Sequence, residues 1–216
     1  MDYGQLVPGA PAGSYPKQIE RKTNMKTKHT GIMETVKNGI VAAVKDTGDI
    51  TKATVDTVSN TLSTTLKDAG NVGASATKAI GHVAGGAIQG AAQAGEHLGH
   101  AAKGIVIGVL HGTKHVGSAA IDTIGHTAGV VIQHTAAVGG KLEHASAGLV
   151  EGAIHSAKKI GVSAEDAASA AADGALKAAG KVGSTAVETV HKAVTKTAHR
   201  AKVVLKQPKA AVSKKK

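Results

Sequence analysis

The sequence predicts an all-α protein of long amphipathic helices, built from tandem 22-residue repeats. Three observations support this class: polar residues recur every 11 positions, glycines recur every 22 positions, and the apolar residues are almost all aliphatic or alanine. Eleven residues equal three turns of about 3.67 residues, close to the 3.6 residues per turn of an α-helix. A β-strand would instead alternate with a period of two residues, and this chain does not.

The 22-residue repeat extends through most of the chain. Eight units fit between His29 and Val204 without an insertion or a deletion, and each unit closes on an aliphatic residue or alanine. Six glycines lie in strict register, at Gly73, Gly95, Gly117, Gly139, Gly161 and Gly183. Segments 44 residues apart are also alike, since 80–82 and 124–126 both read Ile-Gly-His. Duplication of a helical unit is the simplest origin of this pattern.

Within each unit, polar and apolar positions separate. Every eleventh residue from Glu34 to His199 is polar, whereas the columns that start at Ile32 and Val36 contain only aliphatic residues, Ala, Thr or Ser. On a helical wheel this gives an apolar stripe with a polar back. The stripe residues that we expect to face a lipid surface or a partner helix are Ile40, Val44, Val58, Leu62, Leu66, Ile80, Ile88, Leu98, Val106, Leu110, Ile124, Ile132, Leu142, Val150 and Ile154.

The chain divides into a disordered N-terminal segment (1–28), the repeat body (29–204) and a disordered basic tail (205–216). Unbroken, the body would be a helix of roughly 260 Å at about 1.5 Å per residue. Breaks are predicted at 46–49, 69–73, 138–141 and 160–163, so the helices are either kinked or folded into a hairpin or bundle. The break near 161 is best supported, because Gly161 suits a helix C-cap and Ser163 and Asp166 resemble a capping box.

Composition and charge limit the function. The chain has 28 glycines, two tyrosines and no Phe or Trp, which argues against a thick globular core. The formal net charge of +11 belongs almost entirely to the two ends, so the basic tail is expected to make at most non-specific contact with nucleic acid or anionic lipid headgroups. The body lacks aromatic stacking residues and a basic stripe, so sequence-specific reading of nucleic acid is not expected.

No feature predicts catalysis. The acidic residues lie singly on the polar face, and no nucleophile elbow, zinc-protease or phosphate-binding loop motif occurs, so we expect neither an enzyme, a cofactor nor a small-molecule substrate. The first 30 residues lack the apolar core of a secretory signal, and no run of 18 apolar residues occurs. The expected location is therefore cytoplasmic or on a membrane periphery.

The histidines are expected to respond to pH. An unperturbed imidazole titrates near pH 6.5, so a polar face rich in histidine becomes cationic towards pH 5. The residues concerned are His82, His100, His111, His115, His126, His144 and His155. The pairs His97/His100 and His111/His115 could each bring two imidazoles to one metal ion, but both lack a third ligand. We therefore predict polar-face positions and no metal site.

The glycines suggest close helix packing. The six register glycines fall near the centre of the apolar stripe on the wheel, where they would form a groove for another helix. Steps of four, such as Gly104/Gly108/Gly112, are of the same kind, although a chain so rich in glycine contains some by composition alone.

With this period established, the body resembles two groups of proteins. One is the class of lipid-surface helices found in exchangeable apolipoproteins, perilipins and synucleins, and residues 26–31 are loosely similar to the synuclein repeat motif. The other is the group 3 late embryogenesis abundant proteins. The resemblance covers 29–204 and rests on period and composition. The chain departs from both groups. Proline commonly marks apolipoprotein repeats but is absent here between Lys17 and Gln207. The mean hydropathy of this chain is −0.02, which makes it less polar than late embryogenesis proteins.

Three functions follow, in order of preference. The first is a non-enzymatic protein that associates with an anionic lipid or membrane surface through its apolar stripe. The second is a structural protein that associates with itself as a homo-oligomeric bundle or filament. The third is a stress or desiccation protectant that stays disordered until it is dried.

Overall fold

Eight α-helices make up most of the described chain. The computed structural model describes residues 17–69, 73–95, 97–114 and 117–206, and these contain no strand. The helices are α1 (Lys17–Thr47), α2 (Ile50–Ala69), α3 (Gly73–Gln93), α4 (Leu98–Thr113), α5 (Gly117–Ala137), α6 (Leu142–Ala157), α7 (Ala164–Val182) and α8 (Ser184–Arg200), with a 3-10 turn η1 (Lys158–Ile160) after α6. The predicted all-α fold class is confirmed.

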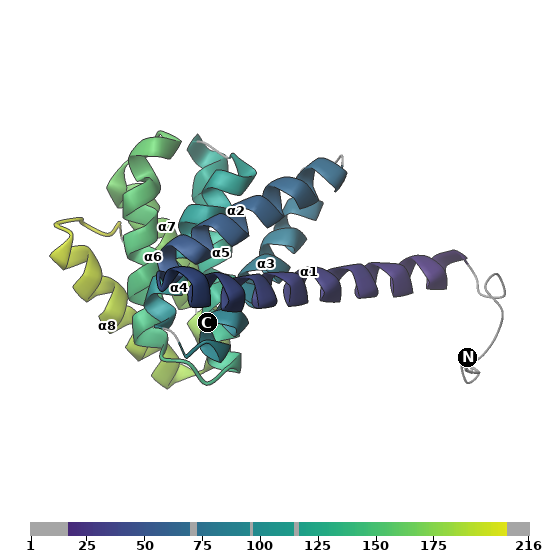
Figure 1. The fold of residues 1–216 in the computed structure, drawn as a ribbon. Coiled ribbons are helices and arrows are strands. Elements are labelled where there is room, and N and C mark those ends of the chain that lie inside the picture. The colour runs from purple at the N-terminus through teal and green to yellow at the C-terminus, as the bar shows by residue number, and fades with distance from the viewer. Residues whose placement is uncertain (1–16, 70–72, 96, 115–116, 207–216) are drawn as a thin grey trace, which may run out of the picture.

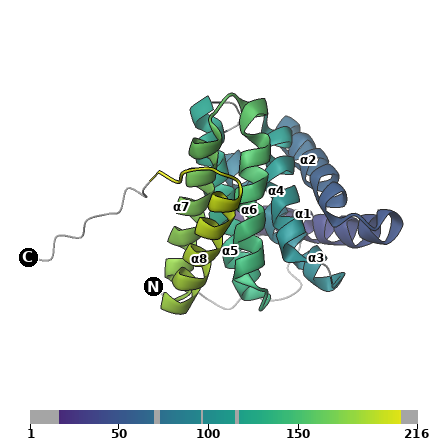
Figure 2. The same ribbon diagram turned by 90° about the vertical axis from the view of Figure 1, so that its left-hand side faces the viewer.

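The helices form two layers. Helices α1, α3, α5 and α7 follow one another in the first layer, and α2, α4, α6 and α8 follow one another in the second. Consecutive helices turn back on each other across the layers, so neighbours within a layer run parallel. Figure 2 shows the succession of pairs from α1 and α2 on one side of the molecule to α7 and α8 on the other. A 22-residue unit thus corresponds to one helix and its turn, and a 44-residue unit to one helix pair.

Local sequence explains where the helices end. Gly48, with a φ of 64°, follows α1, and the Asp49 carboxylate then accepts hydrogen bonds from the backbone N–H groups of Thr51 and Lys52 at 2.9 and 3.1 Å. Gly161, with a φ of 72°, follows η1 in the left-handed region that glycine adopts without steric cost. Helices end at all four breaks expected from the sequence, and also after α3, α4 and α7, where none was expected.

The N-terminal boundary differs from the prediction. Helix α1 begins at Lys17, within the segment 1–28 that was expected to precede the helical repeats. No proline or glycine lies between Lys17 and Thr30, and a helix already formed adds residues at little cost. The first part of α1 projects away from the other helices (Figure 1). Residues 1–16 and 207–216, which include most of the predicted basic tail, lie outside the described residues.

The core is continuous but built from small side chains. One cluster of buried residues extends from Val36 in α1 to Val203 after α8. Its largest fully buried side chains are isoleucines and leucines, among them Ile40, Ile88, Ile105 and Leu149. Alanine makes up much of the rest of the buried core, especially in α7. Small residues let neighbouring helices approach closely, so the chain packs without the aromatic side chains that usually fill a core.

Burial falls from the middle of the chain towards its C-terminal end. Twelve of the sixteen residues of α4 are buried, against six of the seventeen in α8. Helix α8 thus covers α6 and α7 with one face and leaves a polar face outside. A terminal unit with a polar outer face is what closes a stack of repeats in water.

Candidate interaction surfaces

The apolar stripe lies inside the fold. Eleven of its fifteen residues are buried: Ile40, Val44, Val58, Leu62, Ile80, Ile88, Val106, Leu110, Ile124, Ile132 and Val150. The other four, Leu66, Leu98, Leu142 and Ile154, are half-buried. The apolar stripe, which was expected to face a lipid surface or a partner helix, is therefore covered by helices of the same chain. Among the described helices, none has both the length and the hydropathy that crossing a bilayer requires.

Glycines bring α4 against α2 along three turns. A Cβ atom placed on Gly104 would lie 2.8 Å from the Thr51 carbonyl oxygen, and one on Gly108 would lie 2.9 Å from that of Val55. A Cβ atom on Gly112 would lie 2.9 Å from the Ser59 carbonyl oxygen. Because the contacted residue advances by four whenever the glycine does, the two helices run parallel with their backbones in contact.

Glycines make the same close backbone contact between α3 and α1, between α6 and α4, and between α7 and α5. Gly86 and Gly90 of α3 rest on the backbone of α1, where a Cβ atom on Gly90 would lie 2.7 Å from the Lys37 carbonyl oxygen. A Cβ atom on Gly148 would overlap the Gly99 carbonyl, and one on Gly174 would overlap the Gly125 carbonyl. Glycine therefore sets the distance between parallel helices in both layers.

The six register glycines have a different position, which corrects the prediction of a groove. Gly95, Gly139 and Gly161 follow helix ends with φ values of 74°, 68° and 72°, and Gly183 separates α7 from α8. A Cβ atom on any of these four would meet nothing within 4 Å. Gly73 and Gly117 are the first residues of α3 and α5. The helical wheel fails here because each turn resets the helical phase, so a wheel continued through a turn misplaces the turn residue.

Three imidazoles gather where α4 and α6 begin. The His97 and His144 rings stack with centroids 4.2 Å apart, and the His97 and His100 centroids are 5.4 Å apart. Partial burial lowers the pKa of His97, and the nearby His144, His100 and Lys141 lower it further. His100 and His144 are 44 residues apart and so occupy equivalent positions in successive helix pairs. Among the described residues, no group of three or more ligating side chains is arranged to hold a metal ion.

The other histidines are scattered. The His126 ring nitrogen Nε2 lies 3.2 Å from the Thr77 carbonyl oxygen and so joins α5 to α3. His111 and His155 are exposed, and His82 is half-buried. His115, which was also predicted to respond to pH, lies outside the described residues. The six described residues that were predicted to respond to pH therefore lie on four helices, α3, α4, α5 and α6, in both layers of the fold.

Sequence reasoning missed His134. Its ring lies against Gly85 of α3, where an added Cβ atom would be 2.7 Å from the imidazole, and burial lowers the pKa of this histidine. The two residues are 49 positions apart, the same separation as His126 and Thr77. This separation of 49 residues can be recognised only once one contact between α3 and α5 is known, because the repeat length does not determine which residues of neighbouring helices are in contact.

A groove follows α8. A cavity of about 400 Å³ lies between α7, α8 and the segment after Arg200, lined mainly by Leu176, Val194, Ala198, Val203 and Leu205. Asp173 lies at this groove, and burial raises the pKa of its carboxyl group.

The C-terminal segment is held back against the start of α7. The Lys206 backbone N–H donates a hydrogen bond of 2.8 Å to the Ser169 hydroxyl, and the Lys206 ammonium group pairs with Asp166. The segment therefore closes one side of the groove.

Comparison with known proteins identifies the fold class of this chain but not a family. No known family model and no curated protein matches this chain. Among solved structures, the crystal structure of the de novo designed helical repeat protein DHR7 is similar, with a TM-score of 0.50. The similarity covers 82% of this chain and 96% of the designed one at 17% sequence identity, so it concerns the fold alone. The chain is an all-α protein with a helical-repeat fold.

Proposed function

We propose that this chain is a non-enzymatic structural protein whose amphipathic repeats pack on one another to form a helical-repeat scaffold. One observation supports this proposal above the others: the stripe residues are buried against helices of the same chain. The structural part of the second function expected from the sequence, a helical bundle, thus has better support than lipid association, but the self-association expected with it does not. The stripe needs no second copy of the chain to cover it, so the scaffold is proposed as a monomer.

Energetics favour the packed form over a coat on lipid. Burying a Val, Leu or Ile side chain stabilises a fold by about 1.5–3 kcal/mol relative to water. Transfer of an already buried stripe into lipid exchanges one apolar environment for another, so this term would contribute little. The close approach of backbones at glycines such as Gly104 and Gly108 would be broken as the helices separate.

The described surface also offers little for a filament. The exposed large apolar residues are Val138, Val182 and Val204, which are separate in the sequence and follow α5, end α7 and follow α8 respectively. Single exposed apolar residues are normal on monomers, and stable interfaces need a contiguous apolar area. We therefore expect the scaffold to stay monomeric at micromolar concentration.

Circular dichroism combined with light scattering tests the proposal. The scaffold should be helical in dilute buffer, with a helix content independent of protein concentration and little changed by anionic vesicles. Helix content that appears only with vesicles would support lipid association, and helix content that rises with concentration would support self-association. Helix content that appears only on drying would support a desiccation protectant. Each of these three results contradicts the proposal.

A pair of matched substitutions sharpens the test. Val106→Asp places a carboxylate in the core, at a side chain that is 1% exposed, whereas Val182→Asp makes the same change at a side chain that is 47% exposed. Burying an unpaired charge is strongly unfavourable, so Val106→Asp should abolish cooperative unfolding in lipid-free buffer. Val182→Asp should leave the thermal transition within a few degrees. Equal behaviour of the two variants would show that the stripe is not buried in free protein.

A further inference from the structure

Positive charge gathers towards the C-terminal end of the described chain, in α7, α8 and the segment that follows. From Gly174 to Lys206 the chain has seven basic side chains and a single acidic one, Glu188. The basic residues are Lys177, Lys181, Lys192, Lys196, Arg200, Lys202 and Lys206. In the body as a whole the two signs nearly balance, so no basic stripe was expected from the sequence. The local excess is apparent when this end of the chain is considered alone: Lys177 and Lys181 lie in α7, Lys192, Lys196 and Arg200 in α8, and Lys202 and Lys206 after α8.

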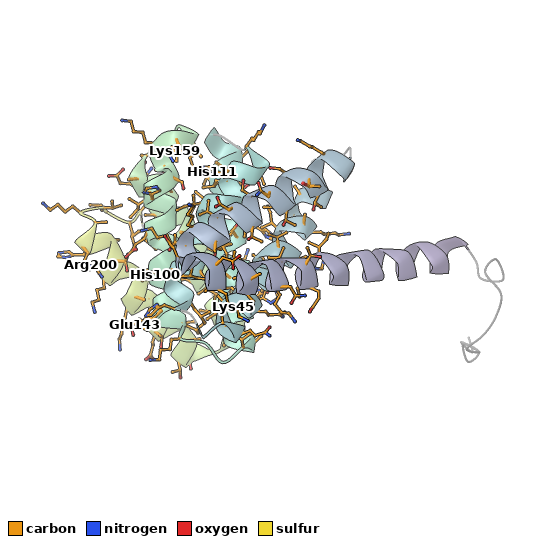
Figure 3. All side chains as sticks on the ribbon, viewed as in Figure 1. Lys45, His100, His111, Glu143, Lys159 and Arg200 are labelled. Atoms are coloured by element: carbon orange, nitrogen blue, oxygen red, sulfur yellow. The ribbon has the colours of Figure 1, made fainter. Side chains whose placement is uncertain are left out.

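Three of these side chains form a row. Lys192, Lys196 and Arg200 are spaced by four residues, so they lie on one side of α8 about 6 Å apart along the helix axis. All three are exposed, and Figure 3 shows Arg200 on the outer side of α8, away from the other helices. We refer to Lys192, Lys196 and Arg200 as the α8 row.

Unlike Lys37 and Lys103 of earlier helices, the α8 row has no ion pair among the described residues. Lys37 pairs with Glu34 at 2.7 Å, and Lys103 approaches Glu151 at 3.8 Å, so these cations are offset by neighbouring acids. Within the part of the chain that the structure describes, no member of the α8 row takes part in an ion pair of 4 Å or less. Three like charges on one helix face repel one another and are stabilised by an external anion.

We propose that the outer face of α8 binds the phosphate backbone of double-stranded DNA without reading its base sequence. An α-helix with its side chains is about 10–12 Å wide, which fits a B-DNA major groove of about 12 Å. Duplex DNA carries about one negative charge per 1.7 Å, a far denser row of charge than most protein surfaces offer. The proposal goes beyond the scaffold function and does not depend on it.

Other polyanions fit this surface less well. Binding to single strands relies on aromatic stacking, and this chain has two tyrosines, neither in the repeat body, and no Phe or Trp. Double-stranded RNA has a major groove too narrow for a helix. A membrane-surface helix inserts its apolar face, but α8 already packs Ala186, Val190 and Val194 inside the fold.

Fluorescence anisotropy with a short labelled DNA duplex and the full-length chain tests this proposal. The variant Lys192→Gln/Lys196→Gln/Arg200→Gln removes the α8 row, and its matched control Lys52→Gln/Lys67→Gln/Lys78→Gln removes three exposed lysines from α2 and α3. The first should weaken binding about tenfold or more and reduce the slope of log K against log salt by about 0.9 for each phosphate that is no longer neutralised. The control, with the same net charge, should change affinity about twofold or less.

Three results would overturn the proposal. Equal losses of affinity in the two variants would show that net charge alone drives binding. A loss confined to Lys214→Gln/Lys215→Gln/Lys216→Gln would assign binding to the tail. Tight binding to vesicles of anionic phospholipid that needs the α8 row, with no binding to the duplex, would make the face a membrane surface. Circular dichroism of each variant confirms that the helices are retained, and none of these results would affect the scaffold proposal.

Discussion

Glycine has two distinct uses in this chain, and single residues show the difference. Gly108 lies in the interior of α4, where its missing Cβ allows the α2 backbone to approach. Gly161 lies after η1 in a conformation with a φ of 72°, where its missing Cβ avoids a clash within its own backbone. The sequence shows the second class as a strict register and part of the first as steps of four, such as Gly104 and Gly108, but the helix that each step contacts becomes apparent only in the fold.

Two alanine substitutions separate close packing from intrinsic helix preference. Gly108→Ala places a methyl group 2.9 Å from the Val55 carbonyl oxygen, so α4 must move away from α2. We expect a decrease of about 1–3 kcal/mol in the free energy of unfolding. Gly81→Ala, in the interior of α3 with nothing within 4 Å, should instead increase it by about 0.5–1 kcal/mol because alanine favours the helix. Urea unfolding measures both, and an increase in both variants would show that α2 and α4 do not pack in this way.

The lowered pKa values of His97 and His134 make stability depend on pH. In the unfolded chain both imidazoles titrate near 6.5, whereas burial holds the pKa of each lower in the folded protein. The unfolded chain therefore binds more protons below this value, so these residues favour folding above about pH 6.5 and that advantage is lost as the pH falls. Urea midpoints should decrease between pH 7 and pH 5. The decrease should be smaller in His134→Gln, and an identical decrease would show that His134 has no part in it.

At the scale of helices, the sequence predicts the number of units better than their ends. Asp49 and the pair Ser163 and Asp166 carry local capping signals, so breaks at these places were predictable. The start of α4 has no such signal, because its N-cap residue His97 makes no capping hydrogen bond with its side chain. Lys141, before α6, also makes none, and the break there was predicted from the neighbouring glycines instead. The end of α4 was missed for a similar reason, since Lys114 takes a left-handed conformation that sequence rules assign to glycine or asparagine.

The start of α7 is the clearest capped element. The Ser163 hydroxyl accepts a hydrogen bond of 3.0 Å from the Asp166 backbone N–H and donates one of 2.9 Å to the Asp166 carboxylate. Ser163→Ala removes both and should lower the free energy of unfolding by about 1 kcal/mol. Ser163→Asp keeps an N-cap acceptor and should lower it less. Thermal unfolding distinguishes the two, and a Ser163→Ala variant as stable as the parent would contradict the cap.

At the scale of the molecule, the periodicity predicted helices but not what the apolar stripe faces. Lipid, a second chain and a neighbouring repeat all satisfy the same aliphatic stripe, because hydrophobic burial has no direction. The information that selects the neighbouring repeat lies in pairs such as Gly148 with Gly99 and Gly174 with Gly125, which are 49 residues apart. A single sequence shows these glycines but not which of them are in contact. The kinds of residue at the candidate surfaces could therefore be predicted, but their positions in the fold could not.

The stacked arrangement predicts a gradient of protection from hydrogen exchange. In a helical stack each unit gains stability from its neighbours, so units with neighbours on both sides open least often. Helix α4, which packs against α2, α3, α5 and α6 and is buried over most of its length, should therefore exchange most slowly. Exchange should be faster in α8 and fastest in the projecting part of α1 (Figure 1). Mass spectrometry of peptides from exchanged protein measures this order. Equal protection along all eight helices would indicate a single cooperative unit, and fast exchange in α4 would show that the two layers are not assembled in solution.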